Sequence, residues 1–315
     1  MKTSVFNKKY QIDNEIYFLE TKDDVLKTVE NFYNIAPFPA YEMSETKFDI
    51  LKKGNSNILA NQFKKFCGFN KSILEAGAGT CQLSSYLSIG TNNMVYALDG
   101  TKSSLEEGLK FKKRNKISNL YLVKGDILES CFDKQSFDFI WCSGVLHHTK
   151  DPYLGFVNLC NYLKKNGYIL VGLYNRYGRL RTLIRKFISK LIINNFLRDK
   201  FLNFFDPVLR SLNKNKLKNK DKIEAWTRDQ YHHPVESLHT LDEVLKWFDK
   251  NDIQYISSIP NCEPSIDNYN KNLFDKEEKG NFINRILIQF AMLFNKMGSE
   301  GGLFVVIGKK NDNIK

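Results

Sequence analysis

Two short segments of the chain place glycine and carboxylate residues where a nucleoside could bind. Gly77 and Gly79 directly follow the apolar run ILEA, and a chain can turn tightly at glycines and bring its backbone N–H groups close to a ligand. Asp99 ends the next apolar run, where a carboxylate can accept hydrogen bonds from both hydroxyls of a ribose. Together the two segments predict a nucleoside site.

Other residues narrow the kind of nucleoside. A dinucleotide fingerprint requires a third glycine after Gly77 and Gly79, but Gln82 stands at that position. Binding of a pyrophosphate is therefore disfavoured, and a nicotinamide oxidoreductase is a lower alternative. Asp126 ends a third apolar run in the sequence Gly-Asp-Ile. Its carboxylate could accept a hydrogen bond from an adenine amino group.

The pair His147-His148 follows a fourth apolar run, and one of its rings could act as a general base. The alternative is that a ring packs beneath a loop, and the sequence leaves both open. Cys81 and Cys142 are expected to be packing residues, because neither has a base beside it in the sequence. The five histidines show no metal-ligand spacing, so we expect no metal site.

Short apolar runs alternate with helical patterns from residue 72 onward. The runs are SILEAGAG, NMVYALDG, LYLVKGD, FDFIWCSG and GYILVGLYN, and two more, QYISSIP and GLFVVIGKK, lie near the end. This alternation predicts a doubly wound, Rossmann-like α/β fold with a mostly parallel sheet that is covered on both faces. A helical pattern also precedes Pro37 and Pro39; its apolar members are Val25, Leu26, Val29, Phe32 and Tyr33.

The positive charge is concentrated in one segment. The net charge is +12, and residues 176–222 contain fourteen Lys or Arg against three acids. The apolar residues of this segment lie on one helical face and basic residues crowd the other; the apolar set is Leu180, Leu183, Ile184, Phe187, Ile188, Leu191 and Ile192. The pattern predicts a basic amphipathic helix, which could form a substrate lid, contact RNA, contact a membrane surface through residues 179–192, or serve as a packing or dimer surface.

The motifs as a set resemble those of class I S-adenosylmethionine-dependent methyltransferases. They are E-x-G-x-G, an acidic end to the second strand, G-D after the third, F-D-x-I-x-C-x-x-V-L-H-H, and L-K-x-x-G-Y. The resemblance covers roughly residues 70–175. It is to the branch of the superfamily that methylates quinones, sterols and other small molecules. The segments Y-N-R-Y-G-R-L and D-Q-Y-x-H-P-x-E-S-x-H-T look like those of bacterial members without an assigned substrate. The resemblance implies a seven-stranded sheet whose last strand is antiparallel.

The resemblance also implies roles for single residues. Glu75, Gly77 and Gly79 would lie near the methionine part of S-adenosyl-L-methionine, Asp99 with Gly100 at its ribose, Asp126 with Ile127 at its adenine, and Cys142 and Ser143 near its amino group. The prolines and aromatics around Tyr33 resemble an N-terminal lid. For the acceptor we expect pocket walls at two polar, aromatic segments, with turn and capping chemistry as the alternative; the candidates are Tyr33, Tyr174, Asn175, Arg176, Tyr177, Arg179, Tyr231 and His232.

We therefore expect an N-terminal helical lid at 1–66, a cofactor-binding core at 67–175 and 230–315, and a basic helical insertion at 176–229. The expected activity is transfer of a methyl group to oxygen or nitrogen of a small acceptor, with anionic and lipid-linked acceptors both open and with Arg176 and Arg179 as candidate anchors. The alternatives are an RNA methyltransferase and, lower, a non-catalytic cofactor-binding protein. Six scattered cysteines and the absence of an N-terminal apolar signal predict a cytoplasmic protein.

Overall fold

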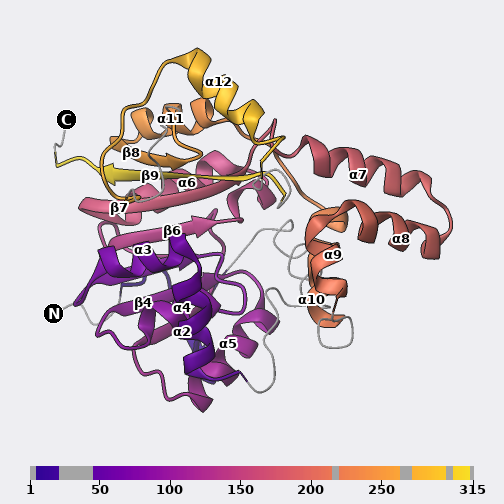
Figure 1. Ribbon diagram of the computed structural model, residues 1–315. Coiled ribbons are helices and arrows are strands. Elements are labelled where there is room, and N and C mark those ends of the chain that lie inside the picture. The colour runs from indigo at the N-terminus through magenta and orange to yellow at the C-terminus, as the bar shows by residue number, and fades with distance from the viewer. Residues whose placement is uncertain (1–4, 21–44, 215–219, 263–271, 296–300, 313–315) are drawn as a thin grey trace.

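A nine-stranded sheet runs through the computed structural model, which describes residues 5–20, 45–214, 220–262, 272–295 and 301–312 (Figure 1). The strand order is β1-β2-β5-β4-β3-β6-β7-β9-β8. The strands are β1 (Tyr10–Asp13), β2 (Ile16–Leu19), β3 (Ser72–Ala76), β4 (Met94–Asp99), β5 (Leu120–Lys124), β6 (Phe137–Ser143), β7 (Leu163–Tyr174), β8 (Ile253–Ile259) and β9 (Leu303–Lys310). The strands β2 to β7 run parallel to one another, whereas β1 is antiparallel to β2 and β9 is antiparallel to both β7 and β8. The predicted doubly wound α/β fold is confirmed.

The expected count of seven strands was wrong, because a hairpin extends the sheet. β1 and β2 pair with each other, and β2 adds to the edge of β5. Ile16 and Leu19 are buried against the sheet, while every residue of β1 is exposed. The outer strand alternates apolar and polar residues over only four positions, which is too short a pattern to predict a strand by itself. Residues 10–19 therefore form strands where the sequence predicted a helical segment.

Helices cover both faces of the sheet. On one face α3 (Ile58–Cys67), α4 (Gln82–Ser88) and α5 (Lys102–Arg114) pack with α2 (Lys47–Ser56) beside them, and on the other lie α6 (Pro152–Tyr162) and α11 (Leu241–Lys250). Successive residues of β4 alternate between the two cores: Val95 and Ala97 face the first group, and Tyr96 and Leu98 face the second. Thr240 caps α11 by accepting a hydrogen bond from the backbone N–H of Glu243.

The basic insertion leaves the sheet after β7 and returns before α11. It contains α7 (Leu180–Leu191), α8 (Asn195–Phe205), α9 (Pro207–Asn213), α10 (Lys220–Thr227) and the single turn η2 (Arg228–His232), which project to one side of the sheet in Figure 1. A separate helix, α12 (Phe282–Ala291), lies between β8 and β9 in the chain. Across the described residues, each helix is too short or too polar to cross a bilayer. All six cysteines are buried and free.

Candidate cofactor and acceptor site

The carboxyl ends of four neighbouring strands bring the predicted cofactor residues to one rim. β5, β4, β3 and β6 lie side by side and run parallel, and their registers place Gly77, Asp99 and Asp126 at adjacent strand ends. Strands are about 4.8 Å apart, so the three loop tips span roughly 10 Å. One extended nucleoside can therefore contact all three.

The glycine turn after β3 is held tightly from both sides. The backbone N–H groups of Gly77 and Ala78 donate to the carbonyl of Leu98, at 2.7 and 3.0 Å. Gly77 has φ +77°, and a Cβ at this position would lie 2.1 Å from a methyl carbon of Val145 in the loop after β6. Both the left-handed backbone and the close approach require glycine here.

The carboxylate of Asp99 is presented by backbone donors. Its Oδ2 accepts from the N–H of Gly79 at 2.7 Å, and its Oδ1 accepts from the N–H of Thr101 at 2.8 Å. Burial raises the pKa of Asp99, while these two donors act in the opposite direction. Each carboxylate oxygen can accept more than one hydrogen bond, so both remain able to accept from a pair of ribose hydroxyls.

Glu75 fixes the start of α4 behind the turn. Its Oε2 accepts from both the backbone N–H, at 2.8 Å, and the hydroxyl of Ser84 in the first turn of that helix. Burial raises the pKa of Glu75 to about 8, the two Ser84 hydrogen bonds lower it, and the nearby Asp99 carboxylate raises it. A cation bound at the rim would favour the ionised form of this carboxyl.

The remaining cofactor candidates lie at the same rim. Asp126 is buried, with Oδ1 accepting from the N–H of Leu128 at 2.8 Å, and Ile127 is buried beside it. At the end of β6, Cys142 is buried and burial raises the pKa of its thiol, whereas Ser143 is half-buried. Among these residues, the half-buried Ser143 and the likewise half-buried Gly100 next to Asp99 leave part of their surface open to a ligand.

The two histidines after β6 have opposite hydrogen-bonding roles. His147 Nδ1 accepts from the backbone N–H of Tyr174 at 3.3 Å, so its proton lies on Nε2. His148 Nδ1 lies 2.7 Å from the carbonyl of Val235, which can only accept, so Nδ1 carries the proton and Nε2 keeps a lone pair. Burial lowers the pKa of both rings, far more for His147, which is completely buried. Only His148 has the form that a general base requires.

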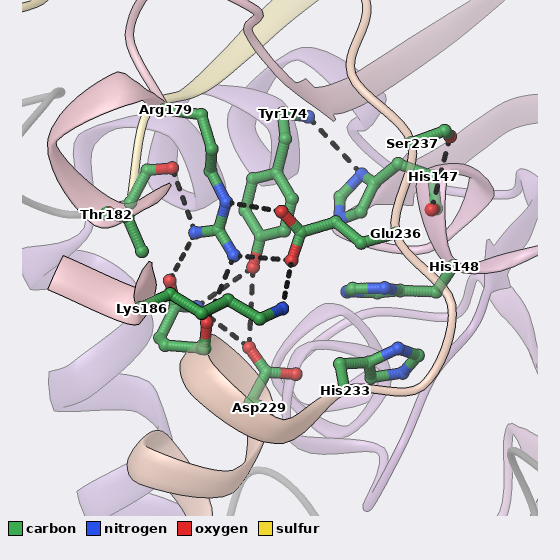
Figure 2. A network of polar contacts seen from close by, with 12 residues as sticks. His147, His148, Tyr174, Arg179, Thr182, Lys186, Asp229, His233, Glu236 and Ser237 are labelled. Atoms are coloured by element: carbon green, nitrogen blue, oxygen red, sulfur yellow. Dashed lines mark hydrogen bonds and ion pairs between the residues drawn. The ribbon is translucent and has the colours of Figure 1, made fainter. Parts of the chain in front are cut away.

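A buried polar network anchors the insertion at the end of β7 (Figure 2). Arg179 is completely buried, and its guanidinium donates to both carboxylate oxygens of Glu236, at 3.0 and 2.9 Å. It also donates to the side chain of Gln230 and stacks 3.6 Å over the ring of Tyr174. Burial acts to raise the pKa of Glu236, but the Arg179 guanidinium outweighs it and the pKa is lowered.

The hydroxyl of Tyr174 continues this network. It accepts from Gln230 Nε2 at 2.9 Å and lies 3.4 Å from Asp229 Oδ2. Figure 2 shows Lys186 reaching Glu236 from the adjacent turn of α7, with Nζ 3.6 Å from Oε2. The donors of Arg179 thus have partners inside the protein, which makes this residue an anchor for the insertion rather than an open anion site.

The other acceptor candidates lie in a turn, inside the insertion or at the surface. Asn175 is buried, and its Oδ1 accepts from the N–H groups of Tyr177 and Gly178, both at 3.0 Å, which describes a turn. Tyr231 is buried within the insertion, where its hydroxyl donates to Asp206 at 2.7 Å. The residues with solvent-facing side chains are Arg176, Tyr177, which is half-buried, and His232. Tyr33 and its neighbouring prolines and aromatics lie outside the described residues.

Sequence reasoning did not assign the acidic and amide partners of this network. Asp229, Gln230 and Glu236 belong to the segment D-Q-Y-x-H-P-x-E, which the sequence marks as polar and aromatic. Arg179, the partner of Gln230 and Glu236, precedes them by more than fifty residues, so nothing in the local pattern reveals the pairing. A buried guanidinium is costly without an acidic partner, so knowing that Arg179 is buried would have implied a buried acidic residue beside it.

This geometry defines a class: a doubly wound fold whose parallel strand ends carry a glycine turn and a neighbouring carboxylate, an arrangement that can bind a nucleoside. Residues 69–196 match the family model of a methyltransferase domain. The match begins just before β3 and ends in α8, so it includes the whole rim. This part of the chain is therefore similar to a methyltransferase domain, in agreement with the resemblance of its motifs.

Solved structures are similar to this chain at low sequence identity. PKMT2 from Rickettsia typhi aligns with a TM-score of 0.54 at 18% identity, covering 81% of this chain and 52% of that one. A chain of the complex between the Haloferax volcanii Trm112 methyltransferase activator and a methyltransferase aligns with a TM-score of 0.49 at 9% identity, covering 93% and 100%. The YcgJ protein of Bacillus subtilis gives a TM-score of 0.44 at 17% identity, covering 80% and 98%.

The described residues contain no group of three or more His, Cys, Asp or Glu side chains placed to hold a metal ion.

Proposed function

We propose that this protein transfers the methyl group of S-adenosyl-L-methionine to an oxygen or nitrogen atom of a small acceptor. The observation that carries the proposal is the alignment of Gly77, Asp99 and Asp126 at adjacent strand ends, with the Asp99 carboxylate oriented by two backbone donors. The residues fit the cofactor, because the carboxylates offer acceptors for ribose hydroxyls and an adenine amino group, and the turn beside them has glycine at positions 77 and 79.

The bound cofactor supplies an activated methyl group on a sulfonium, so the protein chiefly has to orient the two reactants. In this proposal Asp99 holds the ribose, Asp126 with Ile127 holds the adenine, and the open backbone of the Gly77 turn accommodates the methionine part. Glu75 keeps α4 in place and, once ionised, balances positive charge on the ligand.

His148 is the candidate general base for the acceptor. Its Nδ1–H is held by the Val235 carbonyl, so Nε2 has a lone pair for a hydroxyl or amine proton. His147 is a positioning residue, since its ring lies 3.9 Å from that of Tyr174 and accepts from the Tyr174 backbone. The exposed Arg176, unlike Arg179, has a guanidinium at the surface for an anionic group of the acceptor.

An RNA acceptor remains the second candidate because the insertion is strongly basic. The outer face of α7, however, is apolar, with Phe187 and Leu191 each 65% exposed. A surface that tracks phosphates would present its cations there instead. The small-molecule acceptor is therefore the function that we propose.

Isothermal calorimetry with S-adenosylmethionine and S-adenosylhomocysteine tests the proposal. Replacing Asp99 by alanine removes two charge-assisted hydrogen bonds, so the affinity is expected to fall by about a hundredfold or more. Asp249→Ala is the matched control, because this carboxylate is exposed on α11 and pairs only with Lys279 in the contacts described. Equal affinities for the two variants would refute the cofactor site.

The acceptor is then sought with isotopically labelled methyl donor in cell extracts fractionated into lipid, small-molecule and RNA pools. Label in the RNA pool would replace the small-molecule proposal, and cofactor binding without transfer to any pool would support a non-catalytic protein. His148→Gln is expected to lower transfer about a hundredfold while leaving cofactor affinity unchanged.

A further inference from the structure

The helix α7 has its apolar face turned toward solvent. Its buried residues are Thr182, Arg185 and Ser189, all polar. The apolar residues lie on the opposite side and are 37–65% exposed; they are Leu180, Ile184, Phe187, Ile188 and Leu191. A globular protein normally turns such a stripe toward its core.

Polar contacts hold α7 in this orientation. The guanidinium of Arg185 donates to the carbonyl of Phe205 and to the hydroxyl of Thr182, both at 2.9 Å. Lys186 lies 3.6 Å from Glu236 of the buried network. Because the inner face is bound by these specific contacts, rotating the helix to bury its apolar face would break them. The polar contacts of the inner face therefore fix the apolar face of α7 in its outward orientation.

The apolar face continues beyond α7 at both ends. At the turn into α8, Ile193 and Phe196 are 95% and 67% exposed. At the other end, the ring of Tyr177 lies 4.4 Å from that of Phe290 in α12, and Figure 1 shows α12 and α7 following one another along the same border of the molecule. α12 also exposes large apolar side chains: Phe282, Ile283, Leu287 and Phe290. We call the exposed apolar residues of α7, α8 and α12 the apolar ridge.

Basic residues flank the ridge. At 3.6 residues per turn, Arg181 and Lys190 lie on opposite sides of the apolar face of α7, and both are exposed. Lys200 is exposed on α8, with its Nζ 5.0 Å from the centre of the Phe196 ring. Residues 176–222 carry a net charge of +11. An apolar face with cationic flanks is the arrangement of helices that lie in the interface of an anionic membrane.

We infer that the apolar ridge docks this protein on the surface of an anionic lipid bilayer. α7 has twelve residues, or about 18 Å, so it lies in the plane of the interface and does not cross it. A second copy of the chain fits the ridge less well, because it would bring two segments of the same high positive charge together. Docking involves neither the cofactor nor the acceptor, so it stands independently of the proposed function.

Co-sedimentation of the full chain with vesicles tests the inference. Vesicles of phosphatidylcholine with about 30% phosphatidylglycerol are expected to bind the protein at low salt, and pure phosphatidylcholine vesicles to bind it far more weakly. Phe187→Asp is expected to weaken binding about tenfold or more, and Lys190→Gln about fivefold. Phe69→Asp is the matched control, because Phe69 is 63% exposed but lies just before the amino end of β3, whereas the insertion leaves the carboxyl end of β7.

Three outcomes would overturn the inference. They are no binding to the anionic vesicles, equal binding by the Phe187→Asp and Phe69→Asp variants, and a dimer in sedimentation equilibrium that Phe187→Asp dissociates while vesicle binding is absent. Calorimetry with S-adenosylmethionine accompanies each variant. Unchanged cofactor affinity in Phe187→Asp would show that the variant is folded and that docking and cofactor binding succeed or fail separately.

Discussion

Two regions at the carboxyl ends of the parallel strands use charged side chains in opposite ways. At the cofactor rim, Asp99 is held by two backbone N–H groups and keeps acceptor capacity for an outside ligand. At the end of β7, the guanidinium of Arg179 is bound to Glu236, Gln230 and a backbone carbonyl, all within the protein. A charged side chain at a strand end can bind a ligand when part of its hydrogen-bonding capacity is left free. It is a structural anchor when that capacity is used inside the protein.

The largest expected effect concerns the anchor. Replacing Arg179 by methionine leaves the Glu236 carboxylate buried without its partner, which should lower the free energy of unfolding by about 3–5 kcal/mol in urea denaturation. Adding Glu236→Leu should recover part of that loss, because the buried carboxylate that lost its guanidinium partner is then removed. Cofactor affinity should change little in both variants. A large fall in cofactor affinity in a folded variant would mean that the two regions are not separate.

The next effect concerns the glycine turn. Gly77→Ala combines a left-handed residue with a Cβ that would meet Val145, whereas Gly90→Ala has a similar φ of +74° and open space around the new Cβ. The Gly90 variant should lose about 1–2 kcal/mol of stability. The Gly77 variant should lose more and also bind S-adenosylmethionine about tenfold more weakly, since the turn must shift. Equal losses in both variants would show that close approach is unimportant here.

A smaller effect concerns pH. Burial raises the pKa of Glu75 to about 8, so near neutral pH the carboxyl is largely protonated in the free protein. A cationic ligand favours the ionised form, so affinity measured by calorimetry should rise several-fold between about pH 6 and about pH 8.5. Glu75→Gln should bind more weakly and remove this rise. The same raised pKa should favour folding below the ordinary pKa of a glutamate and lose that contribution as pH rises through about 8.

The smallest effect lies within the insertion. Tyr231→Phe removes a donor to Asp206, which still accepts from the indole N–H of Trp226 at 3.0 Å. The loss should be about 1 kcal/mol in thermal or urea unfolding. Neither cofactor affinity nor vesicle binding should change. A change in vesicle binding would show that the packing around Tyr231 controls the position of α7.

For a physical reason, the sequence indicated the residues that gather at the proposed cofactor rim more completely than those that contact Arg179. The glycine turn and the acidic strand ends are local patterns, each readable within a few residues of a buried strand, and the structure brings them together. The Arg179–Glu236 pair joins residues 57 positions apart, and the orientation of α7 is set by contacts of Arg185 that no periodicity encodes. The hairpin β1–β2 was missed because its outer strand alternates apolar and polar residues over only four positions.

The Arg179–Glu236 pair closes the insertion into a loop that leaves and re-enters the core at one point. The entropy of closing a flexible loop grows only with the logarithm of its length, so lengthening or shortening this loop severalfold changes stability by only about 1–2 kcal/mol. The helices between the two residues can therefore be exchanged as a cassette while the strands keep their register. Grafting different helices between positions 180 and 228 would keep Gln230 and the Val235 carbonyl in place, and would test whether the insertion selects the acceptor of the proposed reaction.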